Sequence, residues 1–179
     1  MKTIGKFAIF SAVGFGIGSG AIFGVYEFNY YLVILFGLPV VGAIGGVTLG
    51  LALGRGWRKI AALAGVGAIG FFLGSLVGFI ITAMFTGLSF WEAQLEEILD
   101  SIIFHSVLGT VLGTALGLAL WNWRKVIGLG LAGALGGAIG AMIMSATSLS
   151  PWLQAALHGI VGGASLGAAL GYLEMRRAG

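Results

Sequence analysis

Six long apolar segments, each without a charged residue in its middle, constrain the fold of this chain more than any other feature. A helix needs about 20 apolar residues to cross a bilayer, and each segment comes close to that length. They run from Phe7 to Val25, Leu32 to Gly54, Ile60 to Phe85, Ile102 to Trp121, Val126 to Ala146 and Trp152 to Leu173. We therefore expect an all-α integral membrane protein whose six transmembrane helices form one domain over residues 1–179.

Composition excludes a soluble domain and gives no sign of an enzyme. Hydrophobic residues make up 59% of the chain and charged residues 8%, whereas about a quarter of the residues in a soluble domain are charged. The chain has no cysteine, which excludes disulfides and thiolate metal sites. No Ser-His-Asp set, metalloprotease helix or phosphate loop occurs in the sequence. We expect neither catalytic activity nor a metal centre built from a recognised motif.

All nine Lys and Arg residues fall on one side of the membrane when the segment ends are assigned alternately to the two sides. They are Lys2, Lys6, Arg55, Arg58, Lys59, Arg124, Lys125, Arg176 and Arg177. Cytoplasmic loops carry the excess of basic residues in membrane proteins. The sequence therefore predicts a multi-pass protein of the cell (inner) membrane with both termini in the cytoplasm. Its net charge of +3 suits an anionic inner leaflet and requires no nucleic-acid partner.

Glycines recur at four-residue spacing along the segments. Residues four apart share a helix face, and small residues on such a face let two helices approach closely in lipid. The stretch GFGIGSGAIFG at 14–24 is therefore interpreted as a packing surface, since a nucleotide-binding glycine loop would follow a strand. The predicted packing residues are Gly16, Gly20, Gly24, Gly42, Gly46, Gly50, Gly70, Gly74, Gly78, Gly109, Gly113, Gly117, Gly159, Gly163, Gly167 and Gly171.

Short stretches of sequence repeat as well. GLALGRGWRK at 50–59 matches GLALWNWRK at 117–125 with one deletion, and GAALGYLEMRR at 167–177 is a looser third copy. The repeats predict three glycine-zipper hairpins, 1–57, 58–123 and 124–179, related by a pseudo-threefold axis along the membrane normal. The size and topology are similar to those of the substrate-binding components of energy-coupling-factor vitamin transporters, which is an architectural analogy.

Polar residues inside the segments are few. Thr48, Thr114 and Ser165 are candidate ligand groups, unless they bond to their own helices or across glycine contacts. His105 and His158 lie near the outer ends of the fourth and sixth segments, three positions apart when the glycine runs are aligned. Two neutral imidazoles there could hold a haem, a chlorophyll or another metal, or act as hydrogen-bonded boundary residues. The sequence leaves any cofactor unidentified.

The connection TGLSFWEAQLEEILD at 86–100 predicts a short amphipathic helix on the outer surface, at about residues 89–100. Ser89 and Glu92 form a capping-box pattern, and the apolar side chains gather on one face. The other face carries acidic residues, which suit a cation, a basic partner or simply solvent. They are Glu92, Glu96, Glu97 and Asp100.

Two classes of function remain open. In the first, the protein binds or conducts a small solute near the pseudo-threefold axis, as a transporter, channel or substrate-binding membrane component. In the second, it is a structural packing subunit of a larger membrane complex, with His105 and His158 holding a haem or chlorophyll-type cofactor. In either case we expect it to lie in a lipid bilayer, beside further copies of itself or partner subunits.

Overall fold

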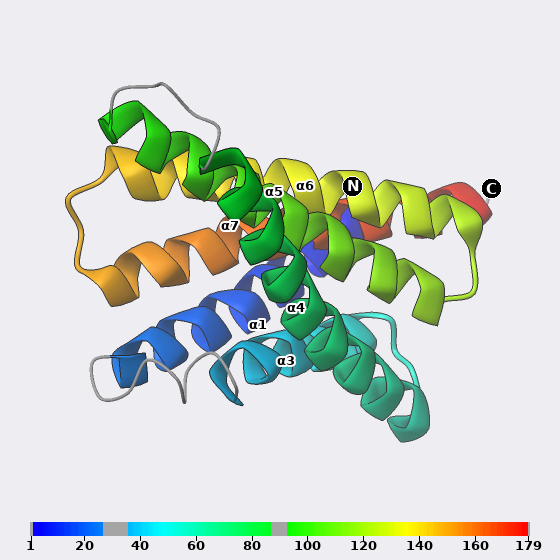
Figure 1. Ribbon diagram of the computed structural model, residues 1–179. Helices are drawn as coiled ribbons and strands as arrows, with labels where there is room; N and C mark the ends of the chain where they lie inside the picture. Colours follow the sequence, from blue (N-terminus) through cyan, green and yellow to red (C-terminus); the bar gives the residue numbers. More distant parts are fainter. Residues whose placement is uncertain (1, 27–35, 87–92, 179) are drawn as a thin grey trace.

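The computed structural model of the protein describes residues 2–26, 36–86 and 93–178. Six helices occupy these ranges (Figure 1), so the expected all-α fold is confirmed for the described part of the chain. Pro39 lies in the first turn of the second helix and Pro151 begins the last, positions where the missing N–H of proline costs nothing. The helices are α1 (Lys2–Tyr26), α3 (Leu38–Ala52), α4 (Trp57–Thr86), α5 (Ala93–Ala119), α6 (Trp123–Ala146) and α7 (Pro151–Ala178).

Five of these helices, all except α3, are long and apolar enough to cross a membrane. Helix α3 has 15 residues, and at a rise of about 1.5 Å per residue it falls short of a hydrocarbon core about 30 Å thick. The predicted second segment starts at Leu32, which lies outside the described residues. The apolar helices thus indicate a multi-pass membrane protein, with five of the six predicted spans found.

The helices form a closed ring in which each packs against its neighbours in sequence and α7 returns to α1. Figure 1 shows both termini and the turns at 53–56 and 120–122 at one end of the bundle, and the connection at 147–150 at the other. Since the Lys and Arg residues lie at or beside these termini and turns, we call this the basic end. The predicted alternation of the segment ends therefore matches the arrangement of the helices.

Large apolar side chains cover the outside of the ring. Ile17, Leu131 and Leu135 are each more than 60% exposed, an exposure that would be unusual over so wide a surface in a soluble monomer. Trp57, Trp121 and Trp123 are exposed at the basic end, where tryptophan is typical of a membrane interface. The outer surface therefore suits contact with acyl chains.

Glycines lie where neighbouring backbones come closest. An added Cβ at Gly46 would overlap the Leu63 carbonyl oxygen of α4, and one at Gly113 would overlap the Leu129 oxygen of α6. Helix α7 meets α1 in the same manner, with Gly163 against the Ser11 oxygen. Further glycines on these three contacts are Gly42, Gly50, Gly109, Gly117, Gly159, Gly167 and Gly171, while Gly70, Gly74 and Gly78 face α5, and Gly16 and Gly20 face α7. The surroundings of Gly24 are not among those described.

Residues 93–100 begin α5 instead of forming a separate surface helix. The helix runs unbroken from Ala93 to Ala119, because no Gly or Pro occurs between Ala93 and Leu108 to interrupt it. The expected boundary before Ile102 is therefore wrong. Ser89 and Glu92 lie outside the described residues, as does the side chain of Glu96.

A buried ion pair joins α6 to α7 at the basic end. The Lys125 ammonium contacts the Glu174 carboxylate, and the two side chains are 2% and 22% exposed. Lys125 lies in the first turn of α6, where the side chain of Asn122 accepts hydrogen bonds from the backbone N–H groups of Arg124 and Lys125. The positive end of the helix dipole lies at the N-terminus, so a cation is disfavoured there. The negative charge of Glu174 compensates for this.

Candidate ligand site inside the helix ring

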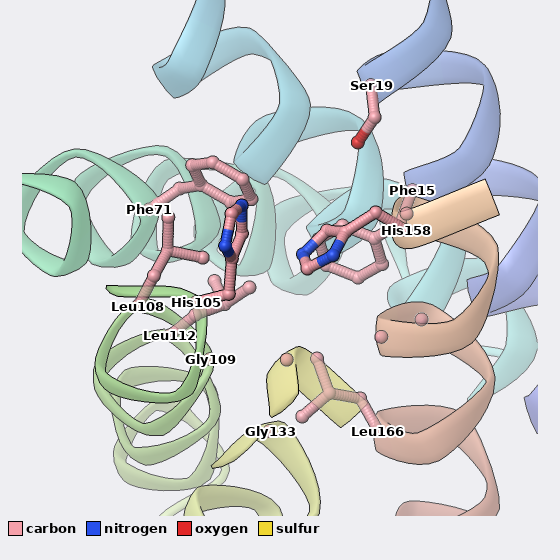
Figure 2. A pocket seen from close by; sticks show the side chains of 14 residues that line it. Phe15, Ser19, Phe71, His105, Leu108, Gly109, Leu112, Gly133, His158 and Leu166 are labelled. Atoms are coloured by element: carbon pink, nitrogen blue, oxygen red, sulfur yellow. The ribbon is translucent and has the colours of Figure 1, made fainter. Parts of the chain in front are cut away.

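Two adjoining cavities lie inside the ring, toward the end opposite the basic one. The central cavity has a volume of about 40 Å³ (Figure 2), and the end cavity, nearer the start of α7, about 80 Å³. Room for one water takes roughly 10–15 Å³ on this measure, so each cavity fits a ligand of only a few heavy atoms. The two cavities share Ser19, Phe71, His105, Leu108 and His158.

Most of the lining is apolar. Phe15 and Phe71 border the central cavity from α1 and α4, and Leu112 and Leu166 border it from α5 and α7. Glycines of α5, α6 and α7 bring backbone up to the remaining sides. Against this background the polar side chains in the lining are Ser19, His105 and His158.

The two histidines are in direct contact. Their ring centroids lie 4.2 Å apart, with an angle of 55° between the ring planes, and Figure 2 shows the rings side by side at the cavity. His105 Nδ1 lies 2.7 Å from the Ser101 carbonyl oxygen. Because a carbonyl only accepts hydrogen bonds, Nδ1 carries the proton and Nε2 keeps its lone pair. His105 therefore offers the cavity a hydrogen-bond acceptor.

His158 lies against Gly140 of α6. An added Cβ at Gly140 would overlap the imidazole at Nδ1, so glycine is required there for the ring to fit. Nδ1 is buried and makes no hydrogen bond of normal geometry to the described residues. Ser19 likewise has no hydrogen bond within the described part of the chain. The site thus holds polar groups with unused bonding capacity.

The hydroxyl residues selected from the sequence lie elsewhere. Thr48 donates to the Gly45 carbonyl at 2.9 Å and faces α1, and Ser165 donates to the Val161 carbonyl at 2.9 Å. Thr114 faces Gly130 of α6. None of the three lines either cavity; they occupy helix contacts, which is the alternative that the sequence left open.

Ser19 is the polar lining residue that the sequence interpretation did not select, and it also did not select Gly140, which makes room for the His158 ring. The signal for Ser19 is a second four-residue spacing in α1, formed by Phe7, Ser11, Phe15 and Ser19, all of them buried. This face turns inward, whereas the Gly16 and Gly20 face meets α7 beside the outer surface. In α1 the larger residues, and not the glycines, mark the side that faces the cavity.

A polar groove opens beside the end cavity. Glu97 and Ser101 of α5 line it together with Ser145, Thr147 and Gln154, and its volume is about 540 Å³. Met144 borders both this groove and the end cavity, and the carbonyl of Ser101 holds His105. We call it the acidic groove, because Glu97 is its charged residue and Asp100 lies on the same turn of α5.

The histidine pair does not fit a haem or chlorophyll. Two imidazoles that bind one haem iron from opposite sides have the macrocycle between them, but these rings touch. Cavities of about 40 and 80 Å³ leave no space for a macrocycle beside them. The touching rings and the small cavities therefore argue against the haem or chlorophyll role expected for His105 and His158. Among the described residues no group of three or more His, Asp or Glu side chains is placed to bind a metal ion.

Comparisons with known proteins give no match. No family model, curated protein or solved structure matches this chain.

Proposed function

We propose that the protein is a transporter or a substrate-binding transport component that holds a small polar solute inside its helix ring. The observation that carries this proposal is the convergence of Ser19, His105 and His158 on cavities enclosed by the ring. Small-molecule sites are mostly apolar with a few placed polar groups, and this lining has that character. With the basic end in the cytoplasm, the acidic groove faces the outside.

The repeats support a solute path along the ring axis. Leu49, Leu116 and Leu166 occupy equivalent positions in the aligned glycine runs and are all buried. Gly54 and Trp121 are also equivalent, and both have positive φ, at 61° and 49°. We infer a pseudo-threefold glycine zipper in which α3 packs on α4, α5 on α6, and α7 on α1. Each packing pair spans a boundary between the hairpins 1–57, 58–123 and 124–179.

Leucine side chains block the proposed solute path between the cavities and the basic end. Leu112 and Leu166 border the central cavity, and the same core cluster contains Leu49, Leu116, Leu129 and Leu170, all at most 1% exposed. A solute bound at the histidines is therefore sealed off from the basic end. Transport requires this leucine layer to open, which favours an alternating transporter over an open channel.

Shortening a leucine of this layer should open the path. We expect Leu166→Ala to raise the water permeability of proteoliposomes, measured by stopped-flow light scattering, and to cost about 2–5 kcal/mol of stability. Leu166→Val removes less volume and serves if the alanine variant does not fold. The matched control is Leu131→Ala, on a side chain 63% exposed on the outer surface. Permeability equal in all folded variants, with no small molecule retained in native mass spectra, would show that the cavity is not part of a path.

An open apolar groove favours the second candidate function, a packing subunit of a membrane complex. It lies between α1 and α7, has a volume of about 730 Å³, and is lined by Ala12, Gly16, Gly20, Ala156 and Ile160 among others. Small residues permit close approach of another helix in lipid. Native mass spectrometry of protein extracted from its own membrane separates the two functions. Stable partner subunits would favour the complex, whereas a single chain or a homo-oligomer with a retained solute would favour transport.

A further inference from the structure

We propose that the solute held at the histidine pair is a small nitrogen base of the ammonia class. It is collected as its ammonium form at the acidic groove and occupies the cavity as the neutral base. This inference rests on the proposed transport function and names its substrate class.

The polar groups of the cavity favour a solute that donates hydrogen bonds. His105 presents the lone pair of Nε2, because its Nδ1 proton is used on the Ser101 carbonyl. The Ser19 hydroxyl can accept as well as donate. No Lys or Arg is among the described residues that line the two cavities, so a carboxylate or phosphate solute would meet no Lys or Arg side chain there. A molecule with several N–H groups on one atom suits this set.

Cavity size restricts the solute to a few heavy atoms. On this measure one water needs roughly 10–15 Å³, and the two cavities measure about 40 and 80 Å³. Phe15, Phe71 and Leu112 are bulky side chains that line the smaller one. Sugars and vitamins are too large for either cavity, while ammonia and methylamine fit.

Charge decides in which form the base enters. No Asp or Glu lines the cavities, as far as the structure describes the chain, and an unpaired cation in so apolar a space is costly. The acidic groove has the opposite character, since the exposed Glu97 lines it and a carboxylate concentrates cations nearby. Ammonium therefore gives its proton to water in the groove, and the neutral base passes Met144 to the histidines.

The chain offers a clean measurement because it has only two histidines. In detergent-solubilised protein carrying isotopically labelled histidine, nitrogen NMR observes just their ring nitrogens. We expect ammonium chloride to shift the His105 Nε2 signal saturably, and His105 Nδ1, which is held by Ser101, to move much less. Because only the neutral base binds, the affinity for total ammonium should rise about tenfold per pH unit while ammonium predominates. Potassium chloride at equal ionic strength and tetramethylammonium should cause no such shift.

Two serine variants separate a binding role from a general effect on the fold. Ser19→Ala removes a hydroxyl from the cavity lining and should weaken ammonium binding about fivefold. Ser165→Ala is the matched control, since its hydroxyl bonds to Val161 of its own helix and lies outside the cavities; it should leave binding unchanged. Equal shifts with ammonium and potassium, or an affinity independent of pH, would overturn the inference.

A neutral probe distinguishes failure of this inference from failure of the proposed function. Formamide is small and hydrogen-bonding but is not a base at these pH values. If formamide shifts the His105 Nε2 signal and ammonium does not, the cavity binds solutes of another class, and the transport proposal stands. If neither probe produces a saturable shift, both proposals are wrong.

Discussion

Replacing Gly67 by alanine should disrupt the bundle, whereas the same change at Gly65, two residues earlier in α4, should leave it intact. An added Cβ at Gly67 would overlap the carbonyl oxygen of Gly42 in α3, while one at Gly65 meets nothing within 4 Å. A backbone oxygen cannot turn aside as a side chain can, so the helices must separate. We expect a cost of about 3 kcal/mol at Gly67 and a gain of up to about 1 kcal/mol in helix propensity at Gly65.

The measurement is the thermal midpoint of each variant in mild detergent, followed by size-exclusion chromatography. Gly163 and Gly162 provide a second matched pair in α7, since a Cβ at Gly163 would overlap the Ser11 oxygen and one at Gly162 meets nothing within 4 Å. Agreement between the two pairs would establish that close backbone contact, and not glycine content, holds the ring together. Equal midpoints within each pair would contradict the glycine-zipper proposal.

The sequence was sufficient to predict that the described chain is helical and which helix ends lie at the basic end, because both features depend on local composition. Apolar length identified the spans, and the basic residues placed the turns at 53–56 and 120–122 beside the termini. The boundary before Ile102 was missed because acidic residues, which suggested a surface helix, do not interrupt a helix when Gly and Pro are absent.

The inward face of each helix was harder to predict, because glycines lie on several faces at once. In α3, Gly42 and Gly46 face α4, while Gly45 faces Phe15 of α1. Four-residue glycine spacing therefore marks a helix contact without saying which neighbour it meets. For this reason Thr48 was a candidate ligand group although it lies at a helix contact, and Ser19 was not selected although it lines the cavity.

The contact between His105 and His158 is a tertiary feature that no local pattern contains. Aligned repeats placed the residues on similar faces of related helices, three positions apart. Their meeting requires α5 and α7 to lie on either side of α6, and it also requires Gly140 to leave space for the second ring. Repeat alignment predicted the relative depth of the two histidines along the membrane normal. Their distance depends on how the helices close into a ring.

Neutralising Glu174 should destabilise the protein by more than removing any exposed charge. In Glu174→Gln the ammonium of Lys125, whose side chain is 2% exposed, keeps its charge and loses its partner. Removing one member of a buried pair costs about 3–5 kcal/mol, and because Glu174 is 22% exposed we expect about 3 kcal/mol. The loss is read from the thermal midpoint or from unfolding in a denaturing detergent.

Two further variants identify the cause of that loss. Glu97→Gln, at an exposed carboxylate on α5, should change stability by less than about 0.5 kcal/mol. The double variant Lys125→Met, Glu174→Leu removes both charges and keeps most of the apolar contact, so it should recover much of the stability lost in Glu174→Gln. If the double variant is as unstable as Glu174→Gln, the packing of these side chains, and not the unpaired charge, is what joins α6 to α7. Recovery would instead show that the unpaired charge of Lys125, and not a loss of packing, destabilises Glu174→Gln.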